Sequence, residues 1–262
     1  MPTDPAGERD FYSMPMVYDV LHTPGTAEDV RGLARMAERF AGGSTHWLEP
    51  ACGTGRYLRS AARLGVRAIG FDAEPGMVEY ATESFAKITP KPRSFVAQME
   101  SFAGAPEAPK PGSIGFAFNP INTIRHLPSD DAMLAHFEQM ARVLAPGGVY
   151  VVGLSLTIYE LEQPSEDVWE GSRGRLHVRQ VVNYLPAAHD RFERVVSHLE
   201  ITRPSGIERV DSTYGLRSYN ADEWCSLLDR AGWGVVAMVD EQALPIERLE
   251  LGYGLFVLEP KR

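Results

Sequence analysis

Residues 46–55 read His-Trp-Leu-Glu-Pro-Ala-Cys-Gly-Thr-Gly, and this stretch decides the fold. We predict a short buried strand from His46 to Ala51, followed by a turn at 52–55 that contains two glycines. A helical pattern of apolar residues between 58 and 64 comes next, and Gly65 ends it. A strand, a tight turn and a helix in this order are the start of a βαβ unit.

The same alternation continues on both sides of this stretch. Helices are predicted to begin at Thr26, which is a good N-cap, at Pro75 and at Ser129. Further strands are predicted at residues 66–72, 94–97, 114–118, 149–154, 234–239 and 252–258. Strands that alternate with helices indicate a mostly parallel sheet of seven strands with helices on both faces. The predicted fold class is therefore α/β.

One segment departs from this order. Three runs of alternating residues between Trp169 and Tyr219 predict an antiparallel meander of three strands, at 176–182, 194–201 and 207–214. We predict a single domain, 1–262, whose core is formed by 24–155 and 220–262 and whose insert is 156–219. The apolar face of the meander must be buried, as a lid over the acceptor pocket, in a homodimer interface, or in both.

The composition of the chain limits the classes of partner and the cellular compartment that we expect. The formal net charge is −9, with 26 Lys and Arg against 35 Asp and Glu, which disfavours nucleic acid as a partner. The two cysteines provide neither a disulfide framework nor a zinc pattern. No apolar run is long enough to span a membrane, and residues 1–10 lack the features of a signal peptide. We expect a cytoplasmic protein with no membrane partner.

The glycine turn predicts a nucleotide-like ligand. Glycine lets the backbone approach a ligand closely, and the helix N-terminus that follows attracts an anionic group. A dinucleotide site requires glycines at the first, third and sixth positions of its fingerprint. Counting from Ala51 places Arg56 at the sixth position, and counting from Gly53 places Leu58 there. Both counts fail the fingerprint.

Two carboxylates favour S-adenosylmethionine instead. Glu49 ends the first strand, where it would repel a pyrophosphate but can anchor an α-amino group. Asp72 ends the second strand, where a carboxylate can accept hydrogen bonds from both hydroxyls of a ribose. An amino acid at one end and a ribose at the other describe this cofactor.

These residues resemble motifs of the class I S-adenosylmethionine-dependent methyltransferases. The segment Glu49–Gly55 resembles motif I, with Ala51 in place of the usual first glycine, and Gly70–Asp72 followed by Met77 resembles the second motif. Residues 98–100 lie where the family often contacts the adenine, although Gln98 replaces the usual Asp. Residues 144–148 match the family's LxPGG segment, and the resemblance covers about residues 18–260.

The resemblance implies a Rossmann-like fold, S-adenosylmethionine as cofactor and S-adenosylhomocysteine as product. The cofactor-binding residues that we predict are Tyr18, Glu49, Ala51, Cys52, Gly53, Gly55, Asp72, Ala73, Met77, Gln98, Met99, Glu100 and Asn119. The insert and the ending Gly252–Val257 look similar to N,N-dimethyltransferases of nucleotide-linked aminosugars and, more distantly, to glycine N-methyltransferase. We therefore expect a small-molecule acceptor, with an amine favoured over a hydroxyl.

The catalytic residues stay open, with Asn119, Asn122, His126 and Tyr18 as candidates. Transfer from a sulfonium needs mainly alignment, and a base only when the acceptor is protonated or is a hydroxyl. A structural or capping role is favoured for His126. Tyr18 either covers the methionine end of the cofactor or packs the leader against the protein. Residues 119–122 contain no acidic ligand for magnesium, so no metal is predicted.

Two alternative functions remain at this point. The βαβ start also fits an NAD-type oxidoreductase, and the fold also fits a non-catalytic module that binds S-adenosylmethionine. Arg173, Arg175 and Arg179 could face an anionic acceptor such as a nucleotide-sugar, but a solvated strand face is the favoured interpretation.

Overall fold

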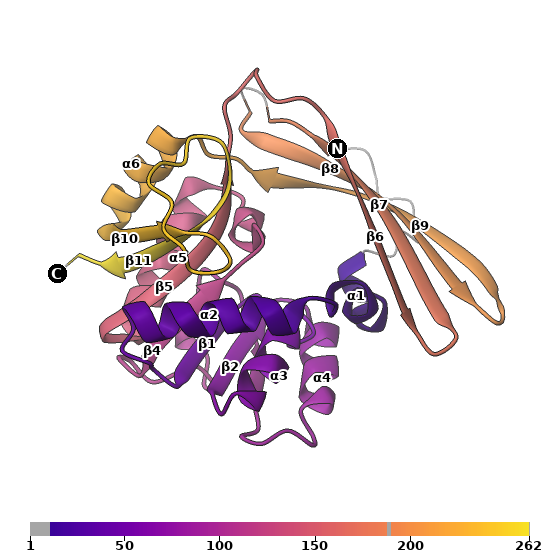
Figure 1. Ribbon diagram of the computed structural model, residues 1–262, viewed down its shortest axis with the longest axis horizontal. Coiled ribbons are helices and arrows are strands. Elements are labelled where there is room, and N and C mark those ends of the chain that lie inside the picture. Colours follow the sequence, from indigo (N-terminus) through magenta and orange to yellow (C-terminus); the bar gives the residue numbers. More distant parts are fainter. Residues whose placement is uncertain (1–10, 188–189, 262) are drawn as a thin grey trace.

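The computed structural model describes residues 11–187 and 190–261 (Figure 1). Residues 1–10, for which no signal peptide is predicted, lie outside this range. The helices are α1 (Pro15–His22), α2 (Thr26–Phe40), α3 (Arg56–Arg63), α4 (Pro75–Ser84), α5 (Asp130–Val143) and α6 (Ala221–Ala231), with short 3-10 turns η1 (Phe11–Ser13), η2 (Phe102–Gly104) and η3 (Thr123–His126). The strands are β1 (His46–Pro50), β2 (Arg67–Asp72), β3 (Arg93–Val96), β4 (Ile114–Asn119), β5 (Leu144–Leu156), β6 (Ser165–Arg173), β7 (Leu176–Leu185), β8 (Phe192–Arg203), β9 (Gly206–Arg217), β10 (Trp233–Val239) and β11 (Gly252–Pro260).

Seven strands form the central sheet in the order β10-β11-β5-β4-β1-β2-β3. The pairs from β5 to β3 are parallel, and β11 runs antiparallel to both of its neighbours. This arrangement confirms the predicted α/β class and the Rossmann-like sheet. In the β1–β2 register Glu49 lies opposite Gly70, so that Glu49 and Asp72 end at the same edge of the sheet.

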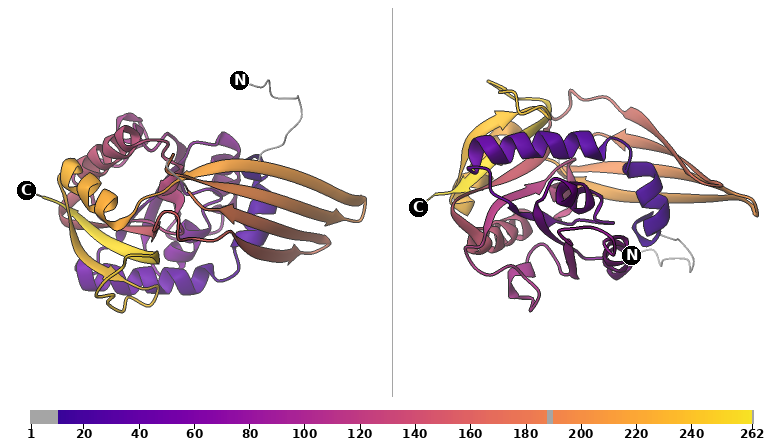
Figure 2. Two further views of the ribbon diagram at one scale, coloured as in Figure 1. Left: turned by 90° about the horizontal axis from the view of Figure 1, so that it is seen from above. Right: turned by 60° about the horizontal axis from the view of Figure 1, so that its bottom comes forward.

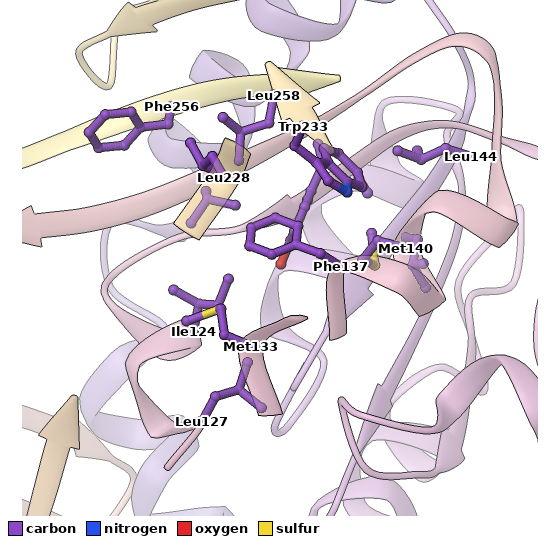
Figure 3. Packing of buried hydrophobic residues seen from close by; sticks show 14 of the residues in the cluster. Ile124, Leu127, Met133, Phe137, Met140, Leu144, Leu228, Trp233, Phe256 and Leu258 are labelled. Carbon is purple, nitrogen blue, oxygen red and sulfur yellow. The ribbon is translucent and has the colours of Figure 1, made fainter. Parts of the chain in front are cut away.

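Helices cover both faces of this sheet. Alternate residues of β5 face opposite sides, so Val149 and Val151 pack with α2, α3 and α4, whereas Tyr150 and Val152 pack with α5 and α6. Figure 3 shows the second of these clusters, in which Phe137 of α5 lies 5.1 Å from Trp233, measured between ring centroids. Each cluster is a continuous apolar layer, which is the main source of stability for such a fold.

The insert forms a separate antiparallel sheet, β6-β7-β8-β9 (Figure 1). The predicted three strands are therefore wrong in number, because β6 precedes them. Strand β6 reads Ser-Glu-Asp-Val-Trp-Glu-Gly-Ser-Arg and is exposed along nearly all of its length. It is an edge strand without a buried face, and so it lacks the apolar alternation that reveals the other three.

Helix α1 joins the insert to the core. It begins with Pro15 as its first residue, and Val17, Val20 and Leu21 pack against Val178 and other buried residues of β7 and β8. Figure 2 shows α1 lying alongside the second sheet, and Asp19 of α1 also accepts a hydrogen bond from Tyr80 of α4. The leader is therefore a structural element that connects the two sheets.

Two of the three predicted helix starts are confirmed in detail. The side chain of Ser129 caps α5, and Pro75 occupies the first turn of α4. Helix α2 also begins at Thr26, but the predicted N-cap role of Thr26 is wrong: Gly25, with φ of 83°, is the N-cap, and the Thr26 hydroxyl instead donates to the carbonyl of His22 at 3.3 Å. No helix among the described residues is both long and apolar enough to cross a membrane.

Candidate active site

The turn after β1 is built from residues in left-handed conformations. Ala51, Gly53 and Gly55 have φ values of 50°, 51° and 68°. A Cβ added to Gly55 would lie 2.6 Å from Cζ of Phe85, so no side chain fits there. The left-handed region costs a residue with a Cβ about 1–2 kcal/mol, which explains why relatives of this motif usually carry glycine where this chain has Ala51.

We expect Gly55→Ala to lower the free energy of unfolding by about 2–4 kcal/mol, from backbone strain and overpacking against Phe85. Denaturant unfolding measures this loss. Gly76→Ala is the control, because its added Cβ would meet nothing closer than 3.5 Å and its φ is not positive. Equal unfolding free energies for the two variants would contradict the expected role of Gly55.

Asp72 holds the turn together from the tip of β2. Its Oδ2 accepts a hydrogen bond from the Gly53 amide at 2.7 Å, and its Oδ1 accepts one from the Glu74 amide at 2.9 Å. Burial raises the pKa of Asp72, although these hydrogen bonds act to lower it. Each oxygen keeps a lone pair for a further donor, so the carboxylate is placed to accept two hydroxyl groups.

Glu49, next to last in β1, and Asn119, the last residue of the neighbouring strand β4, are almost fully buried. The Asn119 amide donates to the Pro50 carbonyl at 2.9 Å, while Asn119 Oδ1 and Glu49 Oε2 have no hydrogen-bond partner among the described residues. Burial raises the pKa of Glu49 well above its ordinary range. Buried acceptors without donors are costly, and an ammonium group would supply the missing donors and a compensating charge.

A cavity of about 470 Å³ opens at this edge of the sheet, and we call it the strand-edge cavity. Its walls contain nine of the predicted cofactor-binding residues: Tyr18, Ala51, Gly53, Asp72, Ala73, Met77, Gln98, Met99 and Glu100. The other four, Glu49, Cys52, Gly55 and Asn119, are buried behind these walls. Burial also raises the pKa of the Cys52 thiol well above its ordinary value, which removes it as a nucleophile.

Tyr18 of α1 covers the glycine turn. Its ring carbon Cε1 lies 3.6 Å from the position of a Cβ on Gly53, and its ring packs against His22 with centroids 4.5 Å apart. Burial raises the pKa of the Tyr18 hydroxyl, so it stays protonated at neutral pH. Tyr18 therefore packs the leader and lines the cavity, and its contact with the methionine end of the cofactor stays a prediction.

The residue next to it, Asp19, was missed by the sequence analysis. It is 2% exposed and bonds to four other side chains. Its carboxylate accepts from the Thr54 hydroxyl at 2.8 Å and the Tyr80 hydroxyl at 3.1 Å, and it forms ion pairs with Arg59 and Arg173. The only signal in the sequence was an acid within an apolar leader. Arg173, considered above for an anionic acceptor, is used in this network.

A second cavity of about 530 Å³ lies between the core and the insert, and we call it the insert cavity. Four residues line both cavities: Tyr12, Tyr18, Thr123 and His126. The two spaces therefore meet at one shared wall. Asn122 lines the insert cavity but is fixed to β5, because its side chain donates to Ser155 Oγ at 2.9 Å and accepts from the Ser155 amide at 2.6 Å.

His126 stands at the shared wall. Its Nε2 is 3.2 Å from the Tyr12 hydroxyl, and its ring stacks on Tyr214 with centroids 5.6 Å apart. The imidazole is exposed rather than packed in the core. Among the described residues no group of three His, Cys, Asp or Glu side chains is placed to hold a metal ion. The reaction without a metal stays a prediction.

A family model described as "Methyltransferase domain" matches residues 48–148, and no curated protein matches the chain. Among solved structures, DesVI of Streptomyces venezuelae is 18% identical, with a TM-score of 0.72 and coverage of 97% of this chain and 100% of that one. The sugar N-methyltransferase KedS8 of a Streptoalloteichus species is 16% identical, with a TM-score of 0.71 and coverage of 100% and 97%.

The amino pentose methyltransferase CalS10 of Micromonospora echinaspora, solved with S-adenosylmethionine bound, is 15% identical, with a TM-score of 0.67 and coverage of 97% and 99%. These structures share the fold of the chain. The domain match sets the alternative of an NAD-type oxidoreductase aside. The match confirms the prediction of a methyltransferase domain at residues 48–148, and the chain shares the fold of these structures. Binding of S-adenosylmethionine by this chain stays a prediction.

Proposed function

We propose that this protein transfers a methyl group from S-adenosylmethionine to the nitrogen of a small-molecule amine. The observation that carries the proposal is the wall shared by the two cavities. A cofactor in the strand-edge cavity and an acceptor in the insert cavity would meet beside Tyr18 and His126. The cofactor supplies a methyl group that is activated by a sulfonium, and alignment of the acceptor is the main task left to the protein.

The residues at the edge of the sheet bind the two ends of the cofactor in this proposal. Asp72 accepts the ribose hydroxyls, and Glu49 with Asn119 holds the α-amino group, directly or through water. The side chains of residues 98–100 border the adenine. Tyr18 closes the site above Gly53 and limits the access of water.

The insert supplies half of the residues that line the proposed acceptor site. Trp169 of β6, Gln180 and Tyr184 of β7, and Tyr214 of β9 line the insert cavity. We therefore propose that the insert acts as a lid within a single domain, and the homodimer stays a separate prediction. The preference for nitrogen is supported by the structural relatives, which are described as a sugar N-methyltransferase and an amino pentose methyltransferase.

His126 is the proposed base. An amine that arrives protonated must lose a proton before its lone pair can attack the methyl group. The imidazole lies at the shared wall, and its contact with the Tyr12 hydroxyl orients the ring. An acceptor amine that takes the place of the Tyr12 hydroxyl at Nε2 would let His126 take that proton.

We expect His126→Ala to lower kcat about 100-fold or more while the affinity for S-adenosylmethionine is unchanged. The assay uses cofactor labelled in the methyl group with a panel of amines and the corresponding alcohols. Imidazole added to the buffer should restore part of the rate. His198→Ala is the control, because His198 lies on the outer face of the insert and pairs with Asp211 at 2.8 Å.

Methylation of the alcohols but not of the amines would contradict the preference for nitrogen. Binding of S-adenosylhomocysteine without turnover of any acceptor would instead favour a non-catalytic module. A wild-type rate for His126→Ala would leave the methyl transfer intact and remove His126 as the base.

A further inference from the structure

The charge of the insert cavity is unusual for a site that accepts nucleotide-linked sugars. The described residues that line it carry four carboxylates, those of Glu162, Asp167, Glu193 and Glu241, and one guanidinium, that of Arg125. A diphosphate bound here would face an excess of negative charge. A cationic acceptor would be attracted to it.

The guanidinium of Arg125 is already engaged in hydrogen bonds and an ion pair within the protein. Arg125 donates to the Arg217 carbonyl at 2.8 Å and to Ser218 Oγ at 2.9 Å, and its Nη2 lies 3.0 Å from Glu193 Oε2. Its side chain is 6% exposed. Arg125 therefore neutralises Glu193 and ties η3 to the insert, and it has no free face for a phosphate.

The other side chains that could carry a positive charge are also unable to bind a diphosphate in this cavity. Burial lowers the pKa of His22 to about 3, so this wall residue is neutral at physiological pH. Arg173 is paired with Asp19, and Arg175 and Arg179 do not line the cavity. No cation of the described lining is thus available to a diphosphate, apart from a protonated His126.

The carboxylates of Glu162 and Asp167 have no such neutralising partner. No Lys, Arg or His among the described residues lies within ion-pair distance of either. Asp167 shares a face of β6 with Ser165 and Trp169, which also line the cavity. Glu162 is close enough to Glu193 to act on its pKa, which burial already raises. Asp167 and Glu193 both act on the pKa of Tyr184, so Glu162, Asp167 and Glu193 lie near one another in the cavity wall.

A second observation at the same cavity indicates a polar ligand. Thr157 is 5% exposed and lines the cavity, and its hydroxyl has no hydrogen-bond partner among the described residues. Aromatic rings of Trp169, Tyr184 and Tyr214 complete the walls. Carboxylates and aromatic faces suit an ammonium group, and an unpaired buried hydroxyl suits a hydroxyl of the ligand.

We propose, on the basis of the methyl transfer proposed above, that the acceptor is a cationic, hydroxylated amine without a phosphate. Glu162 and Asp167 attract and orient its ammonium group, and Thr157 binds a hydroxyl of its body. The carboxylates exclude nucleotide-linked substrates by repelling their diphosphate. This assignment separates the chain from methyltransferases of nucleotide-linked aminosugars, which its insert resembles in sequence.

Calorimetry tests this on the full protein saturated with S-adenosylhomocysteine, so that only the insert cavity remains open. The probes are the methyl glycoside of an aminohexose, which is cationic at pH 7, and thymidine diphosphate. We expect the amine to bind and the diphosphate to give no heat. The double variant Glu162→Gln with Asp167→Asn should weaken amine binding about tenfold. The control, Glu166→Gln, lies between lining residues of β6 and does not line the cavity.

Three results would overturn this assignment: binding of the diphosphate in competition with the amine, no binding of the amine, or an equal effect of the control and the double variant. The preceding titration with S-adenosylhomocysteine keeps the two proposals apart. Failure of that titration would contradict the proposed methyl transfer itself. Binding of S-adenosylhomocysteine with preference for the diphosphate would contradict only the acceptor class.

Discussion

Asp72→Ala should weaken the binding of S-adenosylmethionine about 100-fold or more. Hydrogen bonds to a charged group contribute about 1.5–3 kcal/mol each, and the proposed site uses two of them on the ribose. The variant also removes the acceptors of the Gly53 and Glu74 amides, which order the turn beneath the ligand. Calorimetric titration with S-adenosylhomocysteine measures the loss.

Its control is Glu79→Ala, because Glu79 is an exposed acid on α4 that lines neither cavity. Asp72→Asn should give an intermediate affinity, since it keeps one oxygen acceptor. Because burial raises the pKa of Asp72, cofactor binding by the wild type should also weaken as the pH falls, before an ordinary aspartate would be protonated. Unchanged affinity in Asp72→Ala would remove the ribose contact from the proposed site.

Asp19→Ala should lower the free energy of unfolding by about 3–5 kcal/mol, the usual cost of removing one partner from a buried ion pair. Arg59, with 11% of its side chain exposed, would keep its charge and lose its carboxylate. Thr54 and Tyr80 would lose their acceptor as well. Equilibrium unfolding in urea measures the change, and Arg173→Ala should cost less because that side chain is 47% exposed.

The dependence of the free energy of unfolding on pH, below neutral pH, gives an independent check on the role of Asp19. Burial acts to raise the pKa of Asp19, but Arg59 and the hydrogen bonds outweigh it and hold the pKa below its usual value. A carboxyl group of this kind stabilises the fold above its unfolded-state pKa, and the stabilisation is lost as the pH falls through the folded value. In Asp19→Ala the free energy of unfolding should therefore fall less steeply than in the wild type as the pH is lowered. A variant as stable as the wild type, with the same acid profile, would contradict the role of Asp19.

The parallel core was predictable because its signals are local. Apolar strands, glycine turns and caps such as Ser129 each act within a few residues of the chain. Strand β6 and helix α1 were not predictable in the same way. The first has no buried face, and the second is a short helix whose apolar residues are explained only by the sheet on which they pack.

The residues of the candidate site also fall into those that the sequence could predict and those that it could not. Asp72 and the glycine turn could be found from their spacing, since consecutive parallel strands end at one edge of the sheet. The network of Asp19 and the acids of the insert cavity could not be found from the spacing of residues in the sequence. Asp19 and Arg173 are 154 positions apart in the chain, and no pattern in the sequence announces that they meet. The cytoplasmic location stays a prediction.

The wall shared by the two cavities has a thermodynamic consequence. A ligand that orders Tyr12, Tyr18, Thr123 or His126 changes the surface that the other ligand meets. Linkage requires that the effect be reciprocal, so that the factor by which the cofactor tightens the acceptor equals the factor by which the acceptor tightens the cofactor. The affinity measured for either ligand alone therefore differs from its affinity in the ternary complex in which the reaction takes place.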